Sequence, residues 1–287
     1  MYIDFDALEE LPGAYLSHLS NSDLVPAWSI TGECSKLNNS SDRIRSRLWE
    51  FSSIRPLLMQ ISELAPFINP DERALLFCNP GYEPEHVLTA ASLNVRLRLV
   101  LPFETLRWDE NAQLLLRIVI EGRGYLTSYA GERISVEPGD VLVGNSERCT
   151  PNELNCEEPL ICLDILSVHS NKKKNELNGY RCGHAETINA LSEVSPEDSA
   201  IHIESVTVSA SGFPVFKIPP GESVVLRKSR VSTLIVVLNG EGYTSGELIS
   251  KKWKAFDTFV LPKNSYMKLL NSSPNSVANL LLIEDRL

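Results

Sequence analysis

The sequence predicts an all-β protein in which two related β-barrel, or jelly-roll, domains follow a mainly helical N-terminal extension. Residues 95–167 hold many short apolar runs separated by Gly and Pro turns, as sandwiches and barrels do. The pattern returns later in the chain, and residues before 75 instead carry apolar side chains at helical spacing. We therefore predict an N-terminal helical extension at 1–90, a first barrel at 91–167, a linker at 168–205 and a second barrel at 206–287.

The extension is expected to be mostly helical. Segments 42–49 and 53–62 carry apolar residues at helical spacing. Pro56 suits the first turn of the second of these helices, where its missing N–H has no partner to lose. Residues 74–78 form a short apolar run that is typical of a strand, and the turn Asn79-Pro80-Gly81 closes it.

The first barrel is predicted from short strands between turn residues. The expected strands are 95–101, 114–120, 124–128, 141–143 and 160–167. The tight turn Glu137-Pro-Gly-Asp140 leads into one of them. Residues 168–200 are polar and include the basic run 172–174, so we expect a solvated linker there.

An internal repeat relates the two barrels. The strand and turn at 234–243 repeat those at 114–125, with equivalent glycines 118 residues apart (240 − 122). The turn and strand at 257–262 likewise repeat those at 140–144, at an offset of 117 (257 − 140). A repeat of this length indicates two copies of one domain.

Composition excludes several classes of partner. The chain has 287 residues, 43% of them hydrophobic, and a formal net charge of −10. Nucleic-acid binding needs clustered Lys and Arg to neutralise phosphates, and an anionic membrane surface attracts basic segments. We therefore expect no nucleic acid and no membrane as partners.

The cysteines and the N-terminus favour a cytoplasmic protein. No two cysteines have C-x-x-C spacing, which is typical of reduced thiols in a chain of this size. The first residues, MYIDFDALEELPG, lack the charged-then-apolar order of a signal peptide. The six cysteines are Cys34, Cys78, Cys149, Cys156, Cys162 and Cys182.

Three segments carry a resemblance to a known family. They are Pro102–Tyr125 (PFETLRWDENAQLLLRIVIEGRGY), Leu48–Leu58 (LWEFSSIRPLL) and Asp71–Gly81 (DERALLFCNPG). From about residue 20 to its end, the chain resembles the gentisate and salicylate 1,2-dioxygenases of the cupin superfamily. The resemblance implies a bicupin fold and a homo-oligomer.

The family's metal ligands are replaced in this sequence. Three histidines bind ferrous iron in these dioxygenases, and the matching positions here are Asp109, Asn111 and Thr150, with Asn152 at a flanking histidine position. The corresponding segments of the second barrel, at 225–229 and 264–267, also lack histidine. One carboxylate with two neutral oxygens is a poor ferrous site and suits, weakly, a hard ion such as Ca²⁺ or Mg²⁺. We therefore predict no metal and no other cofactor.

Arg117 and Asp164 match two pocket positions of the family. The arginine there faces the substrate carboxylate, and Gln113 matches a further polar position. A buried arginine needs a partner, so one interpretation is an Arg117–Asp164 ion pair that holds the barrel closed. The other is a guanidinium fork for a carboxylate, enolate or phenolate. The two are compatible.

Several neighbours complete the predicted site. Trp108 either stacks on a planar ligand or fills the barrel mouth, and Asp109 is either a general base in a dry pocket or an exposed loop carboxylate. Cys149 is a candidate pocket thiol. The predicted catalytic residues are Asp109 and Asp164; the predicted ligand-binding residues are Arg107, Trp108, Asn111, Gln113, Arg117, Cys149, Thr150 and Asn152.

Three functions from different classes remain open. The favoured one is a metal-free enzyme that carries out a non-oxidative isomerase, cyclase or lyase step on a small planar aromatic or enolic anion in specialised metabolism. Arg117 would hold the ligand, with Asp109 or Asp164 as acid or base. The first alternative is a catalytically inactive homologue that binds a ligand or supports a partner. The second is a residual iron-dependent ring-cleaving dioxygenase.

Overall fold

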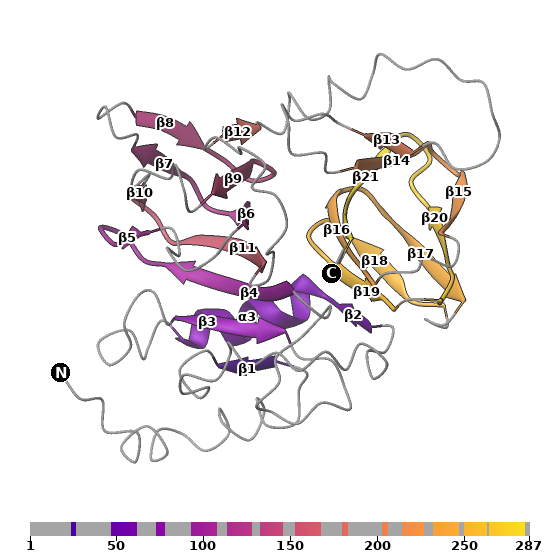
Figure 1. Cartoon of the computed structure of the whole chain (residues 1–287), viewed down its shortest axis with the longest axis horizontal. Helices are drawn as coiled ribbons and strands as arrows, with labels where there is room; N and C mark the ends of the chain where they lie inside the picture. Colours follow the sequence, from indigo (N-terminus) through magenta and orange to yellow (C-terminus); the bar gives the residue numbers. More distant parts are fainter. Residues whose placement is uncertain are drawn as a thin grey trace.

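The computed structural model describes residues 24–26, 47–61, 73–77, 93–107, 114–127, 133–145, 153–167, 180–182, 203–205, 214–226, 232–246, 250–262 and 264–284. They form two β-sandwich units, each with one larger and one four-stranded sheet (Figure 1). Most predicted strands are confirmed to within a few residues.

In the first unit, the seven-stranded sheet has the order β1-β3-β4-β11-β6-β9-β12 and the four-stranded sheet the order β5-β10-β7-β8. The strands of the larger sheet are β1 Leu24–Pro26, β3 Ala74–Phe77, β4 Leu93–Val100, β6 Leu114–Glu121, β9 Val141–Asn145, β11 Leu160–Ser167 and β12 Tyr180–Cys182. The strands of the smaller sheet are β5 Thr105–Leu106, β7 Gly124–Thr127, β8 Arg133–Val136 and β10 Glu153–Cys156. An apolar cluster with members from both sheets fills the space between them.

In the second unit, the six-stranded sheet has the order β13-β14-β21-β16-β19-β2 and the four-stranded sheet the order β15-β20-β17-β18. The strands of the larger sheet are β2 Arg47–Trp49, β13 Ile203–Ser205, β14 Pro214–Ile218, β16 Thr233–Asn239, β19 Thr258–Leu261 and β21 Ala278–Glu284. The strands of the smaller sheet are β15 Ser223–Leu226, β17 Glu241–Gly246, β18 Lys252–Lys254 and β20 Met267–Asn271.

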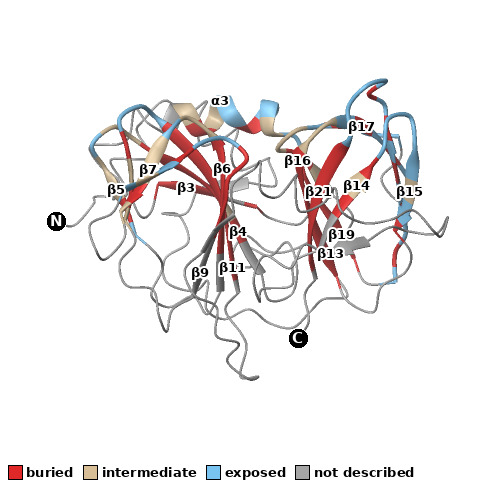
Figure 2. Cartoon of the chain, turned by 90° about the horizontal axis from the view of Figure 1, so that it is seen from above, coloured by how far each residue is buried: buried red, intermediate tan, exposed pale blue. Residues whose placement is uncertain are grey.

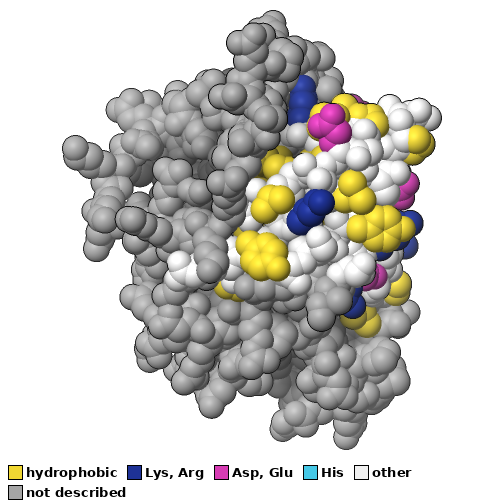
Figure 3. Space-filling model, turned by 90° about the vertical axis from the view of Figure 1, so that its right-hand side faces the viewer, with side chains coloured by type: hydrophobic (Ala, Val, Ile, Leu, Met, Phe, Trp, Pro, Cys, Tyr) yellow, Lys and Arg dark blue, Asp and Glu magenta, His cyan; other side chains and the backbone are white. Residues whose placement is uncertain are grey.

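The smaller sheet of the second unit is buried on one face and exposed on the other. Leu226, Met267 and Leu269 are buried in the second core, whereas Val225 and Leu270, on alternate positions, are partly exposed. Figure 3 shows the exposed side, where apolar, basic and acidic side chains are interspersed. This alternation is what an antiparallel sheet with one solvated face requires.

The repeat read from the sequence holds at the level of single hydrogen bonds. Asp140 accepts the backbone N–H of Glu137 through Oδ2 at 3.0 Å, and Asp257 accepts that of Lys254 in the same way at 2.9 Å. The strand register shifts at Ile161/Cys162 where β11 meets β6, and correspondingly at Val237/Asn239 where β16 meets β21. Two copies of one domain therefore share their turns and irregularities.

We expect Gly242→Ala to destabilise the protein by about 3 kcal/mol, because the new methyl group has no room. An added Cβ would overlap the Leu270 carbonyl oxygen and the Trp253 ring. Gly221→Ala is the matched control: its φ of +72° is strained for alanine, but the surrounding space is open, so about 1 kcal/mol is expected. Urea unfolding measures both variants. Equal losses would contradict the steric explanation.

The described part of the extension contains one helix, α3 Phe51–Ile61, and the strands β1, β2 and β3. The strand predicted at 74–78 is confirmed as β3. The helix predicted at 53–62 is also confirmed, but it begins at Phe51, so Pro56 lies in its second turn and not in its first. Among the described residues, no helix combines the length and apolar character needed to span a membrane.

The helical prediction for 42–49 is wrong at its C-terminal end, where residues 47–49 form β2. Leu48 packs against the core of the second barrel, whereas Trp49 belongs to a different apolar cluster. Neighbouring residues thus face opposite sides, which is the period of a strand. Pairing with β19 supplies the backbone partners that made the strand favourable.

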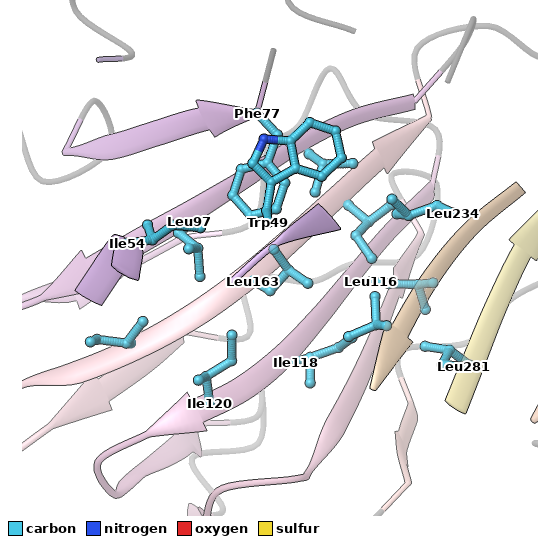
Figure 4. Close-up of a cluster of buried hydrophobic side chains, with 14 of the residues drawn as sticks. Trp49, Ile54, Phe77, Leu97, Leu116, Ile118, Ile120, Leu163, Leu234 and Leu281 are labelled. Atoms are coloured by element: carbon cyan, nitrogen blue, oxygen red, sulfur yellow. The ribbon is translucent and has the colours of Figure 1, made fainter. Parts of the chain in front are cut away.

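One apolar cluster, which we call the shared core, joins the two barrels. It contains residues of the larger sheets of both units together with α3, β2 and β3. Figure 4 shows Leu116 and Ile118 of β6 close to Leu234 and Leu281 of the second barrel. Trp49 of β2 stacks on Phe77 of β3 with ring centroids 5.1 Å apart, so strands attached to different barrels touch. The face of each larger sheet that is turned away from its own barrel interior is therefore apolar and buried.

Helix α3 is tied to both barrels. Its first residue, Phe51, donates its backbone N–H to Asp257 Oδ1 of the second barrel at 2.8 Å. Arg55 donates to both carboxylate oxygens of Glu121 in the first barrel, at 2.6 and 2.5 Å. Figure 2 shows the helix at the top of the molecule, above the junction of the two barrels.

Asp257→Asn is expected to change how stability depends on pH. Burial raises the pKa of Asp257 to about 6 despite the N–H groups of Phe51 and Lys254, and Glu50 raises it further. The folded state then holds a proton that the unfolded chain releases near pH 4, so this group's contribution to stability is lost as pH rises from about 4 to about 6. Asparagine does not titrate, and because it keeps only one of the two acceptor oxygens, the variant also loses stability by an amount that does not depend on pH. Denaturant unfolding at several pH values should show the wild type losing stability relative to the variant across this window; parallel profiles would contradict the prediction.

Candidate functional site

Three adjacent strands direct charged side chains into the first barrel. On β11, Leu163 lies in the shared core and Cys162 in the core of the first barrel. Because alternate residues of a strand face opposite sides, Asp164 points into the barrel. On β6, Ile118 lies in the shared core, so Arg117 also points into the barrel. Arg117 and Asp164 are direct partners in the strand register.

Two further arginines face the same interior from β4. Arg96 is the register partner of Asp164, and Arg98 is that of Cys162. We call Arg96, Arg98, Arg117 and Asp164 the arginine cluster. Apart from Arg96, whose side chain is 14% exposed, its members are at most 5% exposed. The cluster is thus a charged layer inside an apolar barrel.

The ion pair between Arg117 and Asp164, one of the two interpretations of these residues, is present. Arg117 Nε lies 2.7 Å from Asp164 Oδ1 and Nη2 lies 2.9 Å from Oδ2, which is a two-point fork. Arg98 Nε lies 2.9 Å from Oδ2, and Arg96 Nε lies 4.0 Å from the same oxygen. One carboxylate therefore anchors three guanidinium groups.

The arginines keep Asp164 ionised. Burial alone would raise the pKa of this carboxyl, but Arg117, Arg98 and Arg96 together outweigh burial and lower its pKa to about 2. A carboxylate that weakly basic is a poor proton acceptor near neutral pH. Its contacts suit Asp164 for a role as a fixed counter-ion that orients Arg117, and the acid–base role stays a prediction.

Cys156 and Cys162, two buried cysteines of the first barrel, are protonated thiols. Burial raises the pKa of Cys162 to about 12 and that of Cys156 to about 11. Cys156 Sγ lies 3.3 Å from the Leu101 carbonyl oxygen, as a weak donor would. Because the thiolate is the reactive form, neither group is suited to nucleophilic chemistry.

Arg107 contributes to the cluster through its backbone. Its carbonyl oxygen accepts a hydrogen bond from Arg117 Nη2 at 3.4 Å. Its side chain is 71% exposed and lies 3.5 Å from Glu153. The ligand-binding role predicted for its guanidinium stays a prediction. The other predicted site residues, Trp108, Asp109, Asn111, Gln113, Cys149, Thr150 and Asn152, lie outside the described residues.

Comparison with solved structures identifies the fold. A salicylate 1,2-dioxygenase from Pseudaminobacter salicylatoxidans superposes with a TM-score of 0.67 and 18% identity, over 96% of this chain and 94% of that one. The same enzyme with gentisate adducts gives a TM-score of 0.66 over 99% of this chain and 92% of that one. The fold is that of a bicupin.

Sequence comparison finds related dioxygenases over part of the chain. A gentisate 1,2-dioxygenase from Ralstonia sp is 27% identical over 161 residues, which are 56% of this chain and 45% of that protein. Gentisate 1,2-dioxygenase 1 from Aquipseudomonas alcaligenes is 29% identical over 154 residues, 54% of this chain and 44% of that protein. The matched region thus spans less than half of either relative. No protein-family model matches the chain.

The described interior of the first barrel does not suit a ferrous ion. The residues that the resemblance sets at the iron-ligand positions, Asp109, Asn111 and Thr150, lie outside the described residues, so the replacement of the iron ligands stays a prediction. The described barrel interior adds three guanidinium groups around Asp164, whose positive charge opposes a dication. Within the ranges that the structure describes, no three His, Cys, Asp or Glu side chains gather as a metal site requires.

Arg96 and Arg98 are site residues that the sequence patterns did not single out. The sequence of β4 does contain a pattern that could have indicated them: polar residues occupy alternate positions of an apolar strand, Leu93-Asn-Val-Arg-Leu-Arg-Leu-Val100. Lys or Arg at alternate positions is usually the solvated face of an edge strand. Here the face of β4 that carries Arg96 and Arg98 also carries Val100, which lies in the core of the first barrel, so this face is turned to the barrel interior.

Proposed function

We propose that the first barrel binds a small planar aromatic or enolic anion and converts it without a metal, in a non-oxidative isomerase, cyclase or lyase step of specialised metabolism. The arginine cluster is the observation that carries this proposal. A buried cationic layer in a barrel interior suits an anionic ligand, because charge interactions are strong where water is excluded. Salicylate and gentisate, which appear in the names of the related dioxygenases, are aromatic anions of this kind.

Each described residue has a part in the proposed mechanism. Arg117 binds the ligand's carboxylate, enolate or phenolate and stabilises negative charge that develops on it. Asp164 holds Arg117 in place through the two-point fork. Asp109, two residues after Arg107 in the chain, is the proposed acid or base, since Asp164 stays ionised. The apolar residues around the cluster exclude water from the ligand.

A second candidate is a ligand-binding or partner-supporting homologue with no catalytic activity. The charge state of Asp164 favours it: a carboxyl with a pKa of about 2 leaves the described interior with a strong anion-binding group and no proton carrier near neutrality. In this case the ligand would be held by the same cluster and released unchanged.

Ligand titration and product analysis separate these functions. Salicylate and gentisate are titrated calorimetrically into the wild type, Arg117→Met and, as a matched control, Arg55→Met on the surface of α3. Binding that Arg117→Met abolishes and Arg55→Met retains supports the site. Absence of wild-type binding to both acids, and to other aromatic and enolic acids in a thermal-shift screen, would refute it.

Turnover and metal content decide whether the site is catalytic. The bound ligand is incubated with wild type and Asp109→Asn and followed by NMR. Product formed by the wild type alone supports the enzyme, whereas an unchanged ligand supports the binding protein. Stoichiometric iron in protein produced with added iron, together with ring cleavage, would overturn the metal-free proposal. Light scattering tests the homo-oligomer implied by the resemblance.

A further inference from the structure

We propose that Arg96 and Arg98 of β4 determine ligand specificity by recognising a second anionic group, so that the barrel prefers a small aromatic dianion to a monoanion. This inference rests on the proposed function. It assigns a role to Arg96 and Arg98, which have no individual part in the mechanism proposed above.

The register of the strands places the second recognition element beside the first. β11 lies between β6 and β4, with Arg117 opposite Asp164 on one side and Arg96 opposite it on the other. Guanidinium groups from both neighbouring strands therefore flank one carboxylate. A ligand held by Arg117 through one anionic group has the β4 arginines on the far side of Asp164, within the same interior.

The geometry divides the arginines into two kinds. Arg117 is committed to a two-point fork with Asp164 and is fully buried. Arg98 Nε lies 2.9 Å from Asp164 Oδ2, and Arg96 Nε lies 4.0 Å from the same oxygen. Arg96 is also the most exposed member, at 14% of its side chain. Arg96 thus lies nearer to solvent than Arg117 does.

Electrostatics within the cluster favours another negative charge. Burial and the positive charge of Arg96 lower the pKa of Arg98 to about 10, and Arg117 acts in the same direction. The like charges therefore oppose one another across the cluster. An anionic group beside Arg96 and Arg98 would reduce that repulsion, whatever other contacts these side chains make, because it acts through charge.

The test compares matched aromatic acids by calorimetry. Benzoate is the monoanion, and phthalate, isophthalate and terephthalate are dianions that differ in the spacing of the two carboxylates. The wild type is expected to bind one dianion at least ten-fold more tightly than benzoate. Arg98→Met and Arg96→Met should each bring the affinity for that dianion to within about three-fold of the affinity for benzoate, because each variant removes one charged contact to the second carboxylate. Benzoate, held mainly by Arg117, should lose less affinity than the dianion does.

The outcomes distinguish this inference from the proposed function. Wild-type binding of benzoate and of all three dianions with equal affinity would overturn the dianion preference and leave the anion site standing. Absence of binding by every acid would remove both. A preference that persists in both variants would overturn the assignment to β4. Arg96→Met keeps the test decisive if thermal unfolding shows that Arg98→Met does not fold, because Arg96 is partly exposed.

Discussion

Arg117→Met is expected to destabilise the protein by about 3 kcal/mol, because it removes one partner of a buried ion pair. Asp164 is fully buried and would lose its two-point contact. Arg98 would still contact Asp164, which places the expected loss at the low end of the range for buried pairs. Urea unfolding at neutral pH measures the change in the free energy of unfolding.

Arg55→Met is the matched control for this effect. Arg55 and Glu121 also form a two-point pair, but their side chains are 44% and 38% exposed. Solvent screens such a pair, so the expected loss is at most about 1 kcal/mol. Similar losses for the two variants would show that burial does not set the strength of the Arg117 contact.

Leu163→Ala is expected to cost about 3 kcal/mol and to weaken both barrels at once, because Leu163 is fully buried in the core that they share. The substitution lies in the first barrel, on β11. Its effect should reach the second barrel, since Leu234 and Leu281 belong to the same cluster. Removing the leucine side chain leaves a cavity in the shared core, and every element that lines this cavity loses packing contacts and stability.

Hydrogen exchange followed by mass spectrometry measures this coupling. In Leu163→Ala, peptides from β16 and β21 of the second barrel should exchange faster by the same factor as those from β6. Leu270→Ala is the matched control, because Leu270 is 37% exposed on the outer face of the second barrel. It should leave all of these rates within a few-fold of the wild type. Faster exchange confined to the first barrel would contradict a shared core.

Most strands of the barrels were predictable because turn residues bound them. Glycines and prolines mark the ends of these strands. The repeat, with its offset of 118 residues between equivalent glycines, shows the same strand and turn pattern in both barrels. The run Leu114–Ile120 is apolar at nearly every position, which is typical of a strand covered on both faces. That pattern indicated burial, but it carried no information on what covered the second face.

The shared core and β2 depended on contacts that a local pattern does not contain. The composition of residues 47–49 is compatible with a helix and with a strand. These residues form a strand because they pair with β19. Tertiary packing overrode local spacing there. The helix that follows was predicted correctly because eleven residues give a longer and clearer periodic pattern.

Two of the four charged residues of the arginine cluster could be predicted from the sequence. Arg117 and Asp164 stand out as single charged residues within apolar strands, and a buried charge requires a partner. Arg96 and Arg98 did not stand out, because alternation is also the pattern of a solvated strand. Only the register, which brings β4 and β6 to opposite sides of β11, shows that four charged groups meet.

The attachment of α3 to the second barrel has a consequence for how the chain is made. The Phe51 amide and its acceptor, Asp257, are 206 residues apart, so this contact closes a very long loop. Synthesis proceeds from the N-terminus, and the extension therefore leaves the ribosome long before the strand on which it docks. Until then the apolar outer surface of the nascent first barrel is uncovered, and such high contact order slows folding and invites aggregation. We expect the newly made chain to depend on chaperones until its last strands are complete.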